Sequence, residues 1–596
     1  MDALRRYILS APPQQLAGEQ RALLHATKID EFLQAARSGR LTDQDVATFA
    51  QSVHPKLLAH FEKSAGLARG YFLTTTRSLQ FPGGNPFLAA KPPSAGRERQ
   101  LKRVLARRLL AVVRLHRRRG GKNLPHALQL LTSVSHLVAP GGSPGGDRLA
   151  VQRAVESIPT LELERRAAYI GKLTPKAILA RMPSRKSLAG RKSLVNFDHL
   201  LGALGKVHEG KLLVEIYAEN VPGKRRFDRF LPVTALGEGS YCVDDIARTT
   251  VALLQSGSPQ HTTKARAGLR FVAMMQAKDG EFYNFANLKG GKLAVNKSGA
   301  TSKKGIDFWA ARALWAMGEG YATLGAKDPR LARKLTQGLL RTLPRLEESL
   351  KTRYGRYNTV QGQKLPSWLI NGGADQTAVM LKGLLAYYRG LAPGKLRRRV
   401  GDVISKYADG IAQAQVTDKK AADYGRFFHS MGDPTVRHLW GSRQVEVLAE
   451  GGKLLGRADW IRAAARCADH YWGKATPSSI LASGEEQIAY GIESVVSGYA
   501  RLFEATGNRR YAQKTSRWAS WLFGNNKARA VVYDPISGRG YDGIRPVGVG
   551  QRHRYSVNSN AGAESTVEAV LALQSAGRVA GVHAQLRRVL ERNLPR

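Results

Sequence analysis

Acidic side chains recur at or near the start of helical stretches throughout the second half of this sequence. Candidates for acid and base chemistry are five of these, Asp244, Asp245, Asp307, Asp375 and Glu564, together with Asp542 from a long connection. Cleavage of a glycosidic bond needs one carboxylic acid that protonates the leaving oxygen and one carboxylate that activates water or attacks. Free N–H groups and the helix dipole also favour acidic residues in first turns, so capping competes with catalysis at each position.

Aromatic and polar residues in the same region are candidates for holding a ligand. They are Arg248, Phe282, Tyr283, Asn284, Arg312, Trp368, His429, Tyr541 and Asn558. Aromatic faces stack on the apolar faces of sugar rings, although such rings also anchor loops by packing. His429 and His438 share a loop, but their spacing is not typical of a metal site. We expect neither a metal nor another cofactor.

Twelve helical stretches are expected to position these residues. They begin near Val243, Lys264, Ile306, Asp328, Ala374, Gly394, Leu439, Arg457, Glu485, Asn508, Asn560 and Arg578. Connections after the odd-numbered stretches are short, as at 325–328, whereas those after the even-numbered ones are long, as at 279–305 and 525–559. Such repeated hairpins are typical of a closed or solenoidal helical array.

The odd and even stretches differ in composition. Segments 310–325 and 561–577 are rich in Ala, Gly and Leu, which allows close packing in an inner ring. Segments 395–410 and 508–523 are charged on one side, which suits an outer ring. The pattern predicts a mainly α protein, an (α/α)6 toroid of six helical hairpins, with an open solenoid as the alternative. All long connections, and with them the acidic residues, would then gather at one end.

Three regions divide the chain. Residues 1–195 are basic and mostly helical in pattern, and 97–122 form an amphipathic basic helix whose apolar residues are Val104, Leu105, Leu109, Val112 and Val113. Residues 196–235 read as a small β element or connector, in which 212–220 pairs with 224–233 through a turn at 221–223. Residues 236–596 hold the toroid.

Charge is the outlying feature of the composition. Lys and Arg number 93 against 46 Asp and Glu, a net charge of +47, which attracts anionic partners or surfaces. Segment 97–122 is a candidate contact for nucleic acid or an acidic surface, although a solvated helix face is the simpler explanation. Two distant cysteines predict neither a disulfide framework nor a zinc site. No secretory signal or membrane span is apparent, so we predict a cytoplasmic location.

Five segments carry a resemblance to a known superfamily: 243-VDDIARTTVALL-254, 279-DGEFYNF-285, 307-DFWAARALWAMGEGY-321, 532-VYDPISGRGYDGIRPVG-548 and 558-NSNAGAESTVEAVLAL-573. Through them the chain over 240–577 resembles the six-hairpin glycosidase superfamily, in particular toroid modules found alone or attached to bacterial glycosyltransferases. The resemblance implies a toroid with a carbohydrate-facing cleft. The residues that fall on the motif positions of this superfamily, and that the resemblance therefore implies as site residues, are Asp244, Asp245, Arg248, Asn284, Asp307, Arg312, Asp542, Asn558 and Glu564.

The chain departs from this superfamily's pattern at two places. Trp309 and Ala310 stand where the third block usually has His-Gly, and 555–566 carries extra residues before its glycine. Both departures lie near the expected cleft, so a toroid without catalytic activity stays an alternative. Residues 1–195 show no βαβ alternation and no Gly-rich phosphate loop, so no glycosyltransferase domain is expected there.

Two classes of function remain open at this point. In the favoured one the chain is a carbohydrate-active enzyme, a glycoside hydrolase or a lyase, and its basic surface would steer an anionic glycan to the toroid. A lyase would use a Tyr or His base, for which Tyr541, Tyr555 and His429 are available. In the other the toroid is a non-catalytic scaffold that binds a glycan or peptide, while the basic amino-terminal region binds nucleic acid or another anionic partner.

Overall fold

The computed structural model describes residues 95–118, 144–156, 188, 193–221, 229–233, 238–298, 301–360, 362–432, 439, 441–479, 486–547, 554–558 and 560–593. The expectations for the remainder of residues 1–195, for the turn after residue 221 and for His438 lie outside the described residues.

Twelve α-helices form six consecutive hairpins. Six apolar helices alternate in sequence with six amphipathic ones. The first set is α14 (Val243–Gln255), α16 (Phe308–Leu324), α18 (Ala374–Gly390), α20 (Gln444–Leu455), α22 (Ala489–Thr506) and α24 (Ala563–Gly577). The second set is α15 (Pro259–Met274), α17 (Pro329–Arg353), α19 (Lys395–Gln413), α21 (Ala458–Arg466), α23 (Arg509–Ala519) and α25 (Val582–Asn593). All twelve predicted helices are therefore present, with starts that differ from the predicted ones by a few residues.

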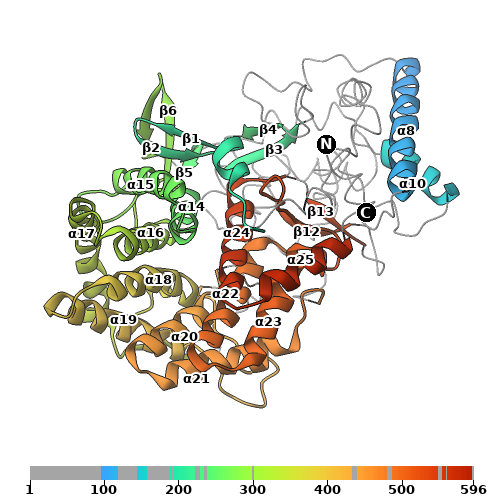
Figure 1. The fold of residues 1–596 in the computed structure, drawn as a ribbon. Helices are drawn as coiled ribbons and strands as arrows, with labels where there is room; N and C mark the ends of the chain where they lie inside the picture. Colours follow the sequence, from blue (N-terminus) through green and yellow to red (C-terminus); the bar gives the residue numbers. More distant parts are fainter. Residues whose placement is uncertain are drawn as a thin grey trace, which may run out of the picture.

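The six apolar helices close into a ring (Figure 1). Each packs on the next one in sequence, from α14 through α16, α18, α20 and α22 to α24, and α24 packs back on α14. Each also packs on the amphipathic helix that follows it, which lies outside the ring. This closure confirms the predicted (α/α)6 toroid and excludes the open solenoid.

Composition explains which helices lie inside. A Cβ atom on Gly318 of α16 would stand 2.1 Å from the carbonyl oxygen of Gly383 in α18, so the two backbones meet at a distance that only glycine permits. On the outer helix α19, Val400, Ile404, Tyr407 and Ile411 are buried at helical spacing, whereas the opposite side carries charged residues. Small residues thus line the inner contacts, and each outer helix buries one apolar face.

Short β-hairpins precede the ring and lie in its connections. Before the ring lie β1 (Gly205–His208) with β2 (Lys211–Val214), and β3 (Tyr217–Val221) with β4 (Arg229–Val233). In the connections lie β5 (Tyr241–Cys242), β6 (Phe285–Lys289) and β7 (Lys292–Val295) in one sheet, and the pairs β8 (Tyr357–Val360) with β9 (Gln363–Pro366), β10 (Tyr533–Asp534) with β11 (Arg539–Gly540), and β12 (Gly543–Val547) with β13 (Arg554–Asn558). Single π or 3-10 turns are η4 (His199–Ala203), η5 (Ile370–Gly372), η6 (Cys467–Tyr471), η7 (Trp472–Lys474) and η8 (Ser520–Leu522).

One predicted strand was wrong. The segment 212–220 does not form a single strand, because Glu215 and Ile216 separate β2 from β3 and the two strands pair with different partners. Glu215 instead bridges to Tyr241, and the amide of Ile216 donates to the carbonyl of Ser240, which ties this region to the start of the ring. The expected pairing with the following segment holds only for β3 and β4.

The basic helix α8 (Ala95–Arg118) packs on α10 (Pro144–Glu156), and Arg117 forms an ion pair with Asp147. Leu105, Leu109, Val112 and Val113 are buried, as their spacing predicts. Val104 was wrongly assigned to this face, since it is 38% exposed.

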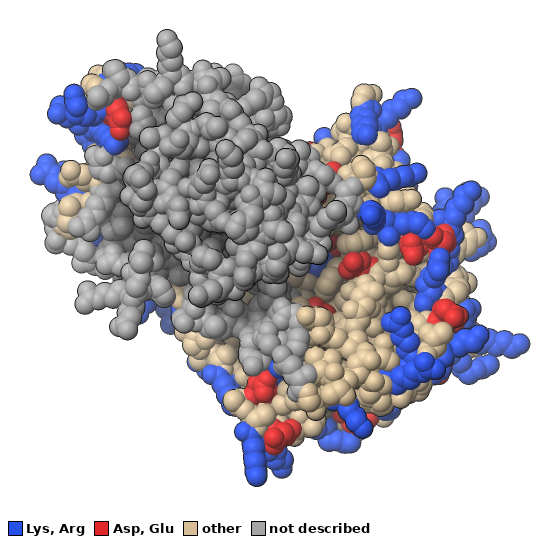
Figure 2. Space-filling model, turned by 180° about the vertical axis from the view of Figure 1, so that it is seen from behind, with Lys and Arg blue, Asp and Glu red and all other residues tan. Residues whose placement is uncertain are grey.

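Lys and Arg side chains also project along the visible edge of the toroid (Figure 2). The positive charge is therefore spread over the outer helices as well as over α8. Within the described parts of the chain, none of the helices has the length and apolar character that crossing a membrane requires.

Candidate active site at the mouth of the toroid

The inner helices all begin at the same end of the ring, which we call the mouth, because each outer helix returns the chain to that end. Contacts near the starts of these helices support this arrangement: Arg312 of α16 bonds to Asp244 of α14, and Arg248 of α14 bonds to Glu564 of α24. The tertiary structure therefore brings acidic residues from distant parts of the sequence together.

Arg312 links three inner helices at the mouth. Its Nη1 donates to Oδ1 of Asp244 at 2.6 Å, and its Nη2 donates to the hydroxyl of Tyr490, in α22, also at 2.6 Å. The ring of Tyr490 lies beside the guanidinium groups of Arg248 and Arg312, with 5.6 and 5.3 Å from Cζ to the ring centroid. Sequence reasoning missed Tyr490, although its place in the first turn of an inner helix is the signal that identified the carboxylates.

Asp307 caps α16, and its carboxyl group forms no ion pair among the described residues. Its Oδ1 accepts from the backbone N–H of Phe308 at 2.8 Å. Burial raises the pKa of this carboxyl; the Phe308 N–H and Arg312 oppose the rise, and the charges of Asp244 and Asp375 add to it. Asp307 therefore caps the helix while its surroundings favour the protonated form.

Asp375 and His429 form a close pair at the mouth. Nε2 of His429 lies 2.6 Å from Oδ2 of Asp375, whose side chain is 4% exposed. The backbone N–H of Ala374 donates to the carbonyl of His429 at 2.9 Å, which fixes the loop against the start of α18. A buried carboxylate that holds an imidazole in one orientation is the arrangement that a general base requires.

Asp245 lies beneath the mouth and not in it. It is 2% exposed, and its Oδ1 accepts from Nη2 of Arg248 at 2.6 Å. Arg248 is itself buried and also donates to Glu564 at 3.0 Å and to Glu568 at 2.6 Å. Of these carboxylates only Glu564, with 45% of its side chain exposed, can meet a ligand. Asp245 and Arg248 therefore support the mouth from within, which corrects their expected contact with substrate.

A second group of acids lies where β12 and β13 meet the starts of α22 and α24. Ser565 donates to Oδ1 of Asp542 at 2.7 Å. Burial raises the pKa of Glu486 to about 7, against the attraction of Arg545; the charge of Asp542 adds to the rise and a hydrogen bond from Asn558 opposes it. Oε1 of Glu486 is buried and has no hydrogen-bond partner among the described residues. The position just before α22 is the sequence signal for Glu486.

Three predicted ligand-stacking aromatics lie in the core instead. Phe282 and Tyr541 are 0% and 1% exposed, and Trp368, also 1% exposed, donates its indole N–H to the carbonyl of Lys406 in outer helix α19. Because both ring faces are covered by protein, these residues are packing anchors of the connections. The sequence could not separate anchors from exposed platforms, since both are aromatic residues in loops.

Two further predicted ligand residues, Tyr283 and Asn284, lie at the start of α14. Tyr283 is partly buried, with Nζ of Lys297 5.7 Å from its ring centroid. The carbonyl of Asn284 accepts from the amide of Val243 at 2.8 Å, and its buried Oδ1 has no partner in the described part of the chain. No cluster of three or more His, Cys, Asp or Glu residues that could hold a metal occurs in the described ranges.

The closed ring and its acidic mouth define this chain as a protein of the (α/α)6 toroid class, which confirms the six-hairpin resemblance for the fold. Among solved structures, it is similar to a D-mannose isomerase (TM-score 0.42, 11% identity, covering 63% of this chain and 93% of that one). It is also similar to the cellobiose 2-epimerase from Spirochaeta thermophila, with a TM-score of 0.41 and 12% identity, covering 66% of this chain and 96% of that one. A family 76 glycoside hydrolase from a bovine Bacteroides thetaiotaomicron strain is similar as well, with a TM-score of 0.40 and 12% identity, covering 65% of this chain and 78% of that one. At these identities the likeness concerns the fold alone. The sequence matches no known family description and no curated protein.

Proposed function

We propose that the chain is a carbohydrate-active enzyme that hydrolyses glycosidic bonds at the mouth of its toroid. The observation that carries this proposal is the contrast between two neighbouring carboxyl groups. Burial favours the neutral form of Asp307, whereas Oδ1 of Asp244 forms an ion pair with Arg312 at 2.6 Å. Hydrolysis of a glycoside uses one carboxylic acid and one carboxylate, and a buried acid beside an ion-paired one suits these two roles.

Each carboxyl group has one role in this scheme. Asp307 donates its proton to the glycosidic oxygen as the bond from that oxygen to the anomeric carbon breaks. Asp244 removes a proton from the water that adds to the anomeric carbon, or attacks that carbon directly. Arg312 and Tyr490 hold Asp244 in place, and the basic outer surface attracts an anionic glycan. Glu564, Asp542 and Asn558 are proposed to contact the remaining sugar units.

Replacement of the two acids tests the proposal. In a panel of chromogenic glycosides and polysaccharides assayed for new reducing ends, Asp307→Asn and Asp244→Asn should each lower kcat by about 10²- to 10⁴-fold. Asp402→Asn, which removes an exposed carboxylate on outer helix α19, is the matched control and should keep full activity. Folded variants that turn over substrate as fast as the control would contradict the assigned roles. Salt-sensitive binding of random DNA without any turnover would favour the non-catalytic alternative.

A second candidate activity is proton abstraction from a sugar carbon, as in a lyase or an epimerase. The pair formed by His429 and Asp375 favours it, because an oriented imidazole is a suitable base. The other two bases considered fit less well: Tyr541 is buried, and the hydroxyl of Tyr555 is bonded to Lys527. His429→Gln should abolish solvent-deuterium incorporation into the sugar, or formation of an unsaturated product, whereas a purely hydrolytic enzyme shows neither reaction.

A further inference from the structure

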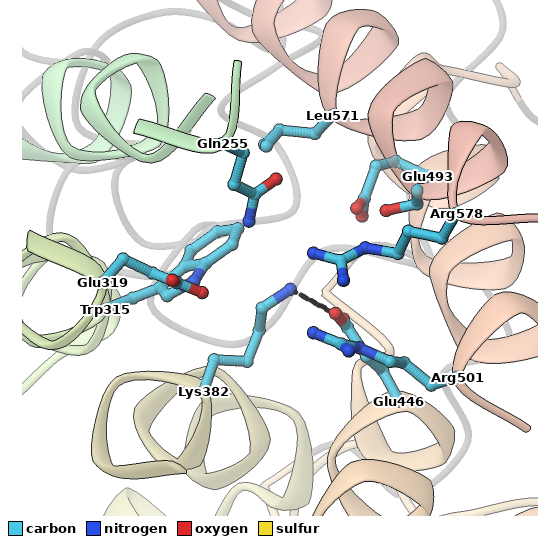
Figure 3. A pocket seen from close by; sticks show the side chains of 10 residues that line it. Gln255, Trp315, Glu319, Lys382, Glu446, Glu493, Arg501, Leu571 and Arg578 are labelled. Atoms are coloured by element: carbon cyan, nitrogen blue, oxygen red, sulfur yellow. Dashed lines mark hydrogen bonds and ion pairs between the residues drawn. The ribbon is translucent and has the colours of Figure 1, made fainter. Parts of the chain in front are cut away.

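A polar cavity lies inside the ring, between the inner helices. Its lining includes Trp315, Lys382, Glu446, Glu493, Arg501 and Arg578. Lys382 and Arg578 point toward its centre, and Lys382 is bonded to Glu446 (Figure 3). The space open to the centre of a water molecule is about 10 Å3, room for about one water, so this cavity is too small for a sugar.

A chain of buried ion pairs connects this cavity to the mouth. It starts at Glu564, which accepts a hydrogen bond from Arg248. Nη1 of Arg248 also donates to Oε1 of Glu568 at 2.6 Å. Oε2 of Glu568 accepts from Nη2 of Arg443 at 3.2 Å. Arg443 in turn pairs with Glu493 and, at 3.2 Å, with Glu446. Through these contacts the chain passes from α24 to α14, back to α24, and then to α20 and α22.

The cavity end of the chain is formed by Lys382 of α18. Its Nζ donates to both carboxylate oxygens of Glu446, at 2.6 and 2.7 Å, and lies 3.9 Å from the ring centroid of Trp315. At the mouth end, Asp245 joins the chain through Arg248. The chain has eight members: Asp245, Arg248, Lys382, Arg443, Glu446, Glu493, Glu564 and Glu568. Except for Glu564, their side chains are at most 6% exposed.

The charges within the chain do not cancel. Five carboxyl groups pair with three cationic side chains, so full ionisation would leave two unbalanced negative charges, with only Glu564 among the five acids exposed to solvent. Arg501 and Arg578, which also line the cavity, do not offset this charge, because they pair with Glu450 and Glu504. Uncompensated charge in a region of low dielectric is costly, and buried acids respond by binding protons. Two bound protons would make the chain neutral.

Two members of the chain are placed to hold these protons. Burial raises the pKa of Asp245 to about 6, and Glu564 and Asp244 add to the rise against the opposing field of Arg248. Burial likewise raises the pKa of Glu493 to about 7; Arg443 and Lys382 oppose this, and Glu568 and Glu446 add to it. Burial also opposes ionisation of Glu446, but Lys382, Arg443 and Arg501 outweigh it and lower the pKa to about 2. Asp245, near the mouth, and Glu493, at the cavity, are therefore the two members whose surroundings raise the pKa and favour a bound proton.

We propose that this chain of ion pairs is a proton-binding switch inside the ring, which is neutral and most stable with two protons bound and which loses stability as they leave near neutral pH. The sign follows from the direction of the two shifts. An acid whose pKa is higher in the folded than in the unfolded state stabilises the fold below its unfolded value, and this stabilisation is lost as the pH rises through the folded value. The window is therefore about pH 6 to 7, where a charge brought to Glu564 at the mouth would also alter proton binding at Asp245.

Replacement of Glu493 tests the switch without any need for enzymatic activity. In the full chain, Glu493→Gln mimics the protonated acid, so its midpoint of thermal unfolding should fall less between pH 6 and pH 8 than that of the wild type. At pH 8 the variant should unfold at the higher temperature. Glu347→Gln breaks an exposed ion pair with Arg399 on an outer helix and should keep the wild-type pH dependence.

Infrared spectroscopy adds a direct readout. The wild type at pH 6 should show the carbonyl stretch of neutral carboxylic acids, and this band should be weaker in Glu493→Gln and in Asp245→Asn than in Glu347→Gln. If Glu493→Gln does not fold, Asp245→Asn and the wild-type titration decide the question. A wild type without neutral carboxyl groups at pH 6, or folded variants with the wild-type pH dependence and band, would overturn the proposal.

Discussion

At the scale of single residues, the same chemical group has different roles because its surroundings differ. Asp244 forms an ion pair at the mouth, Asp307 caps a helix with its neutral form favoured, and Asp245 is buried against Arg248. All three precede or open an inner helix in the sequence. The protonation of Asp245 and of Asp307 depends on burial and on neighbouring charges, several of them from other helices, so it is a property of the tertiary structure.

Glu486 provides a prediction at this scale. Burial raises its pKa from 4.5 to about 7, so its contribution to stability is present below about pH 4.5 and is lost as the pH rises through 7. Glu486→Gln should unfold at the same temperature as the wild type at about pH 4 and should be more stable at pH 8, by up to about 3 kcal/mol. Thermal unfolding at both pH values checks this. A variant that is less stable than the wild type at pH 8 would show that the carboxylate form is needed.

At the scale of helices, packing depends on how closely the inner helices approach one another. The α16 and α18 contact has glycine on both sides: a Cβ atom on Gly383 would stand 2.5 Å from the backbone carbon of Leu314. Real side chains do not tolerate such distances, so the two helices must move apart when either glycine gains a methyl group. The small residues of the inner helices are therefore needed for close packing between helices, in addition to any effect on helical propensity.

Gly318→Ala tests this contact. Although alanine is the better helix former by about 1 kcal/mol, the new methyl group would overlap a backbone oxygen, and overpacking of this kind costs about 1 to 3 kcal/mol or more. We expect a lower midpoint of thermal unfolding. Gly394→Ala is the control, because nothing lies within 4 Å of the added atom and the backbone there is extended. Equal stability of the two variants would argue against the close approach.

At the scale of the whole molecule, the ring closes only when the last hairpin joins the first. Helix α24 packs on α22 and on α14, and its residues Val567, Val570 and Leu571 are buried. Arg248 and Arg443 also form ion pairs with Glu568, which lies on this helix. One element therefore completes both the apolar contacts of the ring and its buried ion pairs.

Deletion of residues 559–596 should accordingly abolish the folded ring and not merely shorten it. The exposed faces of α14 and α22, with two buried arginines left without Glu568, should give an aggregated or expanded chain in size-exclusion chromatography and a loss of cooperative unfolding. A compact, cooperatively unfolding product of the deletion would show that the hairpins act as independent repeats.

The sequence by itself determined the number, order and alternation of the helices, because helical periodicity and connection length are local properties of the chain. From these it also indicated that acids such as Asp307 and Asp375 would gather at one end. It did not reveal Tyr490 or Glu568 as partners of the predicted arginines, nor that Phe282 and Trp368 are core anchors. Those assignments depend on which side chains from distant segments meet and on how much water they exclude. Only ring closure brings those segments together, and so only the tertiary structure decided which acids face a ligand and which ones balance charge inside the ring.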